Sequence, residues 1–101
     1  MAVTSKALVR GAATTNTATV LYTTPAATTT VISNIGVTNT AGSAGTFTLA
    51  LAGTAIHTTT AIAANTTIYI DCKQVLVATN TITGGASATS INFHISGVEI
   101  A

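Results

Sequence analysis

Apolar and polar residues alternate along parts of this chain with a period of two. In the segment 46–52 phenylalanine and leucine alternate with threonine and alanine, and in the segment 91–96 isoleucine and phenylalanine alternate with asparagine, histidine and serine. Successive side chains of a β-strand point to opposite faces of the sheet, so this pattern predicts strands with one buried face. The apolar series continues out of step at Val98 and Ile100, and we expect a β-bulge at Gly97 that keeps these side chains inward.

Less regular windows of the same kind predict further strands at 7–10, 17–23, 30–39, 66–71 and 74–78. Turn-forming residues lie between the predicted strands, at Asn16, Pro25, 41–45, Gly53, 63–65, Asn80 and Gly84-Gly85. Seven or eight short strands at this spacing predict an all-β fold, a single antiparallel β-sandwich over residues 1–101 that is jelly-roll-like or of a related topology. The segment 1–12 is the exception, because it is also compatible with an arm that packs on a neighbouring molecule.

Charged residues are scarce, and threonine takes their place. Only Lys6, Arg10, Asp71, Lys73 and Glu99 carry a fixed charge, whereas an average soluble protein has about a quarter of its residues charged. Threonine supplies 24 of the 101 positions, and its branched side chain favours strands while its hydroxyl group remains compatible with water. A net charge of +1 argues against a nucleic-acid-binding protein, which needs a basic stripe. It also provides little repulsion between copies of the chain.

The N-terminal segment and the cysteine content indicate where the protein is made. No apolar run typical of a cleaved signal peptide precedes Arg10, and the apolar runs elsewhere fall far short of the roughly 18 residues of a membrane-spanning helix. Cys72 has no second cysteine with which to form an internal disulfide, and we interpret it as a small buried hydrophobic residue. We therefore expect a protein made in a cytoplasm, without a signal peptide and without a membrane partner.

Groups capable of catalysis or metal binding are few. The complete set of histidines, cysteines and acidic residues is His57, His94, Cys72, Asp71 and Glu99. Asp71 and Cys72 are adjacent, so within a strand they face opposite sides, which works against a shared site. The sequence lacks the ligand spacing of a zinc site, a phosphate-binding loop and a carboxylate pair for sugar hydrolysis. It thus predicts no catalytic residue, no cofactor and no metal site, unless other chains supply the missing groups.

The histidines and aromatic residues bear on binding. We expect His57 in a turn or short strand and His94 on a polar strand face, each either exposed or part of a subunit interface. Sugar-binding sites use exposed aromatic rings as platforms, but the aromatic residues of this chain mostly fit core positions. They are Tyr22, Phe47, Tyr69 and Phe93. Carbohydrate binding without catalysis stays open as an alternative.

The neutral faces and weakly protected strand edges predict assembly. Natural proteins protect edge strands with lysine, proline and inward-pointing charges, and all three are scarce here. We infer that partners cover the edges and faces, either in an isologous dimer or in a closed ring such as a trimer.

Four segments resemble small structural proteins of tailed bacteriophages. They are VLYTTPA at 20–26, VISNIGVTNT at 31–40, IAANTT at 62–67 and ISGVEI at 95–100. The resemblance extends from about residue 17 to the end of the chain, and capsid cement proteins and tail or fibre modules share this pattern. It implies a β-sandwich, often a jelly roll, that oligomerises, commonly as a homotrimer. It implies no catalytic residues.

Within that family, we favour a capsid cement, or decoration, protein that binds the outside of the shell and bridges neighbouring major capsid proteins in the virion. A partner that binds only the assembled shell stabilises it by mass action, and many symmetric copies multiply modest contacts. The N-terminal segment holds two of the three cations, so Lys6 and Arg10 are the candidate capsid contacts.

The alternative is a tail or fibre component that recognises a host-surface glycan. Its function would lie in loops, for which the segments 41–45 and 80–90 are the candidates because their residues are small. Copy number separates the two hypotheses, since a cement protein is present in far more copies per particle than a tail component.

Overall fold

A computed structural model of the chain describes residues 2–71 and 73–101. This part of the chain contains nine strands and no helix, which confirms the predicted all-β class with slightly more strands than expected. The strands are β1 (Val3–Ala12), β2 (Val20–Thr23), β3 (Thr29–Asn39), β4 (Gly45–Leu51), β5 (Thr54–Ile62), β6 (Thr66–Ile70), β7 (Val75–Leu76), β8 (Thr81–Ala86) and β9 (Ile91–Ile100). Within the described residues, no helix has the length and apolar character needed to cross a lipid bilayer.

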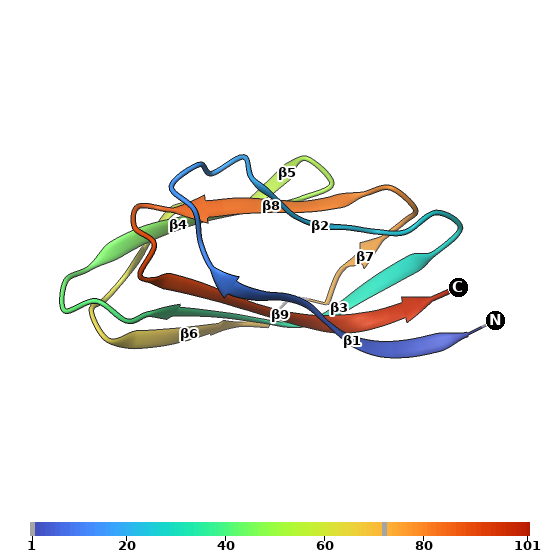
Figure 1. The fold of residues 1–101 in the computed structure, drawn as a ribbon, viewed down its shortest axis with the longest axis horizontal. Coiled ribbons are helices and arrows are strands. Elements are labelled where there is room, and N and C mark those ends of the chain that lie inside the picture. Colours follow the sequence, from blue (N-terminus) through green and yellow to red (C-terminus); the bar gives the residue numbers. More distant parts are fainter. Residues whose placement is uncertain (1, 72) are drawn as a thin grey trace.

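The strands form two antiparallel sheets that pack face to face (Figure 1). Sheet A has the order β1-β9-β3-β6, with β7 also paired to β3, and sheet B has the order β2-β8-β4-β5. The chain therefore crosses between the sheets repeatedly, and its first and last strands lie side by side in sheet A. Apart from the two-residue β7, this is the four-plus-four arrangement of two Greek keys that defines a jelly roll.

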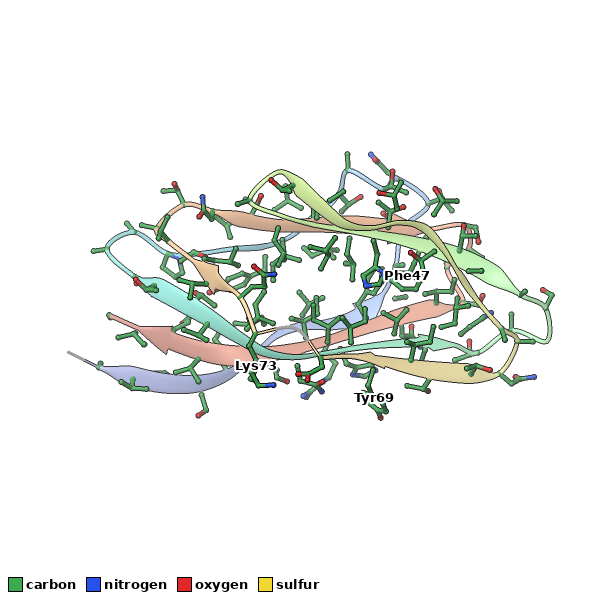
Figure 2. All side chains as sticks on the ribbon, turned by 180° about the vertical axis from the view of Figure 1, so that it is seen from behind. Phe47, Tyr69 and Lys73 are labelled. Atoms are coloured by element: carbon green, nitrogen blue, oxygen red, sulfur yellow. The ribbon has the colours of Figure 1, made fainter. Side chains whose placement is uncertain are left out.

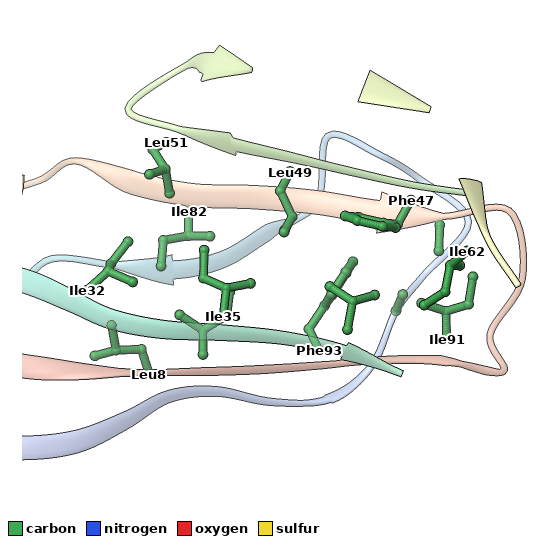
Figure 3. Packing of buried hydrophobic residues seen from close by; sticks show 14 of the residues in the cluster. Leu8, Ile32, Ile35, Phe47, Leu49, Leu51, Ile62, Ile82, Ile91 and Phe93 are labelled. Atoms are coloured by element: carbon green, nitrogen blue, oxygen red, sulfur yellow. The ribbon is translucent and has the colours of Figure 1, made fainter. Parts of the chain in front are cut away.

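The core lies between the sheets and consists of the inward-facing members of the alternating series. Phe47 of sheet B and Phe93 of sheet A are both buried, and their rings meet edge to face with centroids 6.4 Å apart (Figure 3). Ile35, Leu49 and Ile82 belong to the same core and are likewise fully buried. The predicted strand 46–52 and its buried face are thus confirmed.

The predicted bulge at Gly97 is wrong, because β9 alternates without interruption to its end. The extra residues lie on its neighbours instead, at Leu8 of β1 and Ser33 of β3. Gly97 faces inward, and a Cβ at this position would come within 3.0 Å of the Leu8 side chain. Consequently Val98 and Ile100 face outward from sheet A and are partly exposed.

Strand β8 falls where the sequence predicted a loop, and β5 falls where it allowed either a turn or a short strand. Strand β8 occupies most of the proposed glycan-binding loop 80–90, and β5 occupies the region around His57. In the other proposed loop, 41–45, Gly45 already belongs to β4. The segment 1–12, considered as an arm, contributes β1 to the chain's own sheet A through pairing with β9.

Candidate assembly face

An apolar patch lies on the outer surface of sheet A, at the end where the two chain termini meet. Strand register aligns Val75, Val31 and Val98 across β7, β3 and β9, and it pairs Ile100 of β9 with Val3 of β1. Val3 and Val75 are 62% and 61% exposed, and the other three side chains are half-buried. We call these five residues the apolar patch. A contiguous apolar surface of this kind on a small domain typically marks an interaction site.

The outer face of sheet A is large enough for a stable interface. The molecule measures 45 × 21 × 18 Å, so one broad face matches the roughly 800 Å² that each partner buries in a standard protein–protein interface. Apolar area contributes about 25 cal/mol for each Å² removed from water. The exposed valines therefore favour a partner that covers them.

A row of polar and aromatic residues crosses the same face beyond the apolar patch. Register places Arg10 beside His94, His94 beside Gly36 and Gly36 beside Tyr69, from β1 across to β6. Arg10 and His94 are exposed. Because tyrosine and arginine are enriched among the residues that dominate binding energy at interfaces, the composition of this row fits a contact surface.

Tyr69 is an exception to the prediction that the aromatic residues mostly occupy core positions. Its side chain is 73% exposed and points away from the sandwich, whereas Phe47 points into it (Figure 2). A Cβ at Gly36 would lie 3.3 Å from the Tyr69 ring, so the glycine lets the ring lie close against the sheet. The exposed Tyr69 ring is therefore available as an aromatic binding platform.

The two candidate capsid contacts, Lys6 and Arg10, do not form one cationic site. The bulge at Leu8 shifts the register of β1, so Lys6 pairs with Gly97 on the inner side of the sheet and Arg10 pairs with His94 on the outer side. A regular strand would have placed these side chains, four residues apart, on the same face.

Lys6 belongs to a polar network that joins the two sheets. Its ammonium nitrogen lies 3.4 Å from Oε2 of Glu99, and the Tyr22 hydroxyl donates a hydrogen bond of 2.5 Å to the same oxygen. Because the Tyr22 proton is used in this way, the Thr30 hydroxyl donates to the Tyr22 oxygen at 2.8 Å. The hydrogen bond from Tyr22 and, to a smaller extent, the interaction with Lys6 lower the pKa of Glu99. Burial and the neighbouring carboxylate raise the pKa of Tyr22.

The strand edges are better protected than the sequence indicated. Edge strand β1 carries Lys6, Arg10 and the bulge at Leu8, all of which disfavour pairing with another strand. In sheet B, β5 is an edge strand, and its register against β4 is broken twice. The outer face of sheet A is therefore a better candidate for assembly than the edges formed by β1 and β5.

The remaining titratable residues are scattered. His57 lies in β5, partly buried, with its ring 5.3 Å from the Phe47 ring and its Nδ1 3.2 Å from the Thr60 hydroxyl oxygen. Asp71 forms an exposed ion pair of 2.6 Å with Lys73. Cys72 lies outside the described residues. Among those described, no three histidine, cysteine or acidic side chains come close enough together to hold a metal ion.

Comparison with models of known protein families and with curated protein sequences gives no match to this chain. The function is therefore inferred from the fold and its surfaces.

Proposed function

We propose that this protein is a virion structural component that associates with copies of itself through the apolar patch and binds a larger protein surface. The apolar patch is the observation that carries the proposal, since it offers exposed valine on a chain with little charge repulsion. Jelly rolls are frequent in viral capsid proteins and in lectins, and the resemblance to tailed-phage structural proteins points to the first group.

The most specific form of the proposal is a capsid decoration protein that bridges major capsid proteins. The outer face of sheet A has the apolar patch at one end and the polar row with Arg10 and Tyr69 beyond it. A homotrimer or another closed ring suits such a face, because the two parts can contact different neighbouring proteins. Arg10 is the better placed of the two candidate capsid contacts, since it is exposed beside His94, whereas the charge of Lys6 is partly compensated by Glu99.

Self-association is tested first, by sedimentation of the purified protein. We expect a discrete oligomer for the wild type and a shift towards the monomer for Val75→Lys, because lysine in the patch must be desolvated on association. Val20→Lys is the matched control, since Val20 is 56% exposed but belongs to sheet B. An oligomer that survives Val75→Lys and dissociates with Val20→Lys would place the interface on sheet B and contradict the proposal.

Capsid binding is tested with particles that lack the protein. Co-sedimentation near one copy or more per capsid subunit is the expected result, and Arg10→Ala should weaken it more than Lys6→Ala, which removes the same charge from the inner side of sheet A. A protein that ignores capsids and occurs in only a few copies per virion would instead be a tail component.

A further inference from the structure

A hollow of about 190 Å³ lies over the outer surface of sheet B, on the side of the molecule opposite the apolar patch. The connection between β1 and β2 and the strand β5 both rise above this sheet (Figure 1). Six of the eight lining residues carry a hydroxyl group, namely Thr15, Thr17, Thr46, Thr48, Thr59 and Ser87. Phe47 and Ala86 also border the hollow, but both are buried, so its apolar surface comes from the methyl groups of the threonines.

The first wall is the connection between β1 and β2, and Gly85 determines its position. A Cβ at Gly85 would overlap the backbone carbonyl of Asn16, so only glycine lets the connection approach the sheet this closely. Backbone hydrogen bonds from Gly84 to Thr19 and from Ala86 to Thr14, both 2.9 Å, attach the connection to β8. The wall is therefore held in place before any ligand binds.

The second wall is a bulge of β5, in which Thr59 has a φ of 46°. A β-branched residue rarely adopts this left-handed conformation, and strain of this kind is concentrated at binding sites. The Thr59 backbone N–H donates a 3.0 Å hydrogen bond to the Thr48 hydroxyl oxygen, which holds the strained residue over the hollow.

The hydroxyl groups retain capacity to bind a ligand. The Thr48 oxygen accepts from the Thr59 N–H, and the Ser87 oxygen accepts from the Thr46 N–H at 3.0 Å. Both hydroxyl protons remain available for donation, because each hydroxyl group is one donor as well as an acceptor. No lining residue is charged, and β2, β4, β5 and β8 contain no aspartate, glutamate, lysine or arginine.

We propose that this hollow binds one neutral sugar residue of a glycan. Several preorganised hydroxyl groups beside a small apolar surface match a pyranose, which has hydroxyl groups on its rim and C–H groups on its faces. The volume is below the roughly 300–1,000 Å³ of drug-sized ligand sites, which suits a single sugar ring. This activity goes beyond the proposed structural role, and both can operate together because they use opposite sheets.

The test is a nuclear magnetic resonance titration of the ¹⁵N-labelled protein with the methyl glycosides of glucose, galactose, mannose and N-acetylglucosamine. We expect at least one glycoside to shift the backbone amide signals of Thr48, Thr59 and Ser87 while leaving Tyr69 and His94 on sheet A unchanged. Thr48→Val should weaken binding about ten-fold, since it removes one hydrogen-bonding hydroxyl group from a site of the same shape.

Two controls separate sugar binding from a loss of structure. Thr38→Val removes a hydroxyl group from the outer face of sheet A and should leave binding unchanged. Thr17→Val tests the other wall, where no bulge depends on the hydroxyl group, and it should also weaken binding. This variant keeps the test valid even if Thr48→Val disturbs the fold. The proposal is overturned if none of the four glycosides shifts these signals, if the shifts fall on sheet A, or if glycerol shifts the same signals as strongly.

Discussion

The missing side chain of Gly97 allows three strands of sheet A to pack closely at one point. A Cβ on this inward-facing residue would overlap the carbonyl oxygen of Val31 on β3 and approach the Leu8 side chain of β1 to 3.0 Å. The backbone carbonyl cannot move without breaking the pairing of β3 with β9. The glycine therefore serves close packing, whereas the sequence had suggested that it marks a bulge.

Gly97→Ala should lower the free energy of unfolding by about 1–3 kcal/mol, the usual cost of overpacking a core. Gly11→Ala is the control, because nothing lies within 4 Å of a Cβ at Gly11 on the neighbouring strand β1. Urea denaturation followed by circular dichroism measures both. Equal stability of the two variants would contradict the packing described for Gly97.

Exposure of single residues was predictable only where the alternation was unambiguous. Phe47 and Phe93 stand among polar neighbours, and both are buried as predicted. Tyr69 stands between two isoleucines, so every residue of that triplet is apolar and the pattern does not reveal which one faces outward. The glycine that accommodates the Tyr69 ring is on another strand, 33 positions away in the sequence, where no local pattern indicates the contact.

At the level of whole strands, the sequence predicted seven of the nine described strands and missed β5 and β8. Strand β5 contains irregularities in its register with β4, which disrupt the period of two. Strand β8 includes Gly84 and Gly85, which read as turn residues, although Thr48 and Asn16 leave no space for side chains there. The hollow over sheet B depends on both strands, and for this reason no sequence pattern indicated it.

The two sheets are also linked by a hydrogen-bond network that depends on pH. Because the pKa of Glu99 is lowered in the folded state, its contribution to stability is present above the ordinary carboxyl pKa and is lost as the pH falls through the folded-state value. Tyr22→Phe removes the hydrogen bond that contributes most to this lowering. The stability difference between wild type and variant should therefore be larger at neutral pH than at about pH 3.

Urea midpoints at the two pH values measure this effect. Tyr69→Phe provides the control, since it removes a hydroxyl group from an exposed tyrosine on the outer face of sheet A. If Tyr22→Phe and wild type lose stability in parallel as the pH falls, the acid sensitivity originates elsewhere in the molecule.

Across the whole molecule, charge is distributed unevenly between the two sheets. All five residues with a fixed charge lie on strands of sheet A or directly after β6, and the strands of sheet B carry none. Sheet A, which carries the apolar patch and the Tyr69 row, thus also carries the charges, while the hollow lies over the neutral sheet B. This division suits protein contacts on one side and an uncharged ligand on the other.

The position of the chain termini gives a test of assembly that leaves every residue of the apolar patch in place. Ala2 and Ala101 exchange backbone hydrogen bonds of 3.0 and 2.8 Å, directly beside Val3 and Ile100 of the patch. The turn that contains Gly42 lies at the opposite end of the molecule, and Gly42 is exposed (Figure 1). A folded domain fused without a linker before Ala2 would occupy the space above the patch, whereas the same domain inserted after Gly42 would not.

We therefore expect the N-terminal fusion to sediment as a monomer and the insertion after Gly42 to keep the oligomer of the wild type. Circular dichroism of both proteins establishes that the sandwich is intact, because the spectra should differ only by the contribution of the added domain. If the N-terminal fusion remains oligomeric and the insertion dissociates, the copies meet at the end of the sandwich near Gly42, and the valines of sheet A serve another partner.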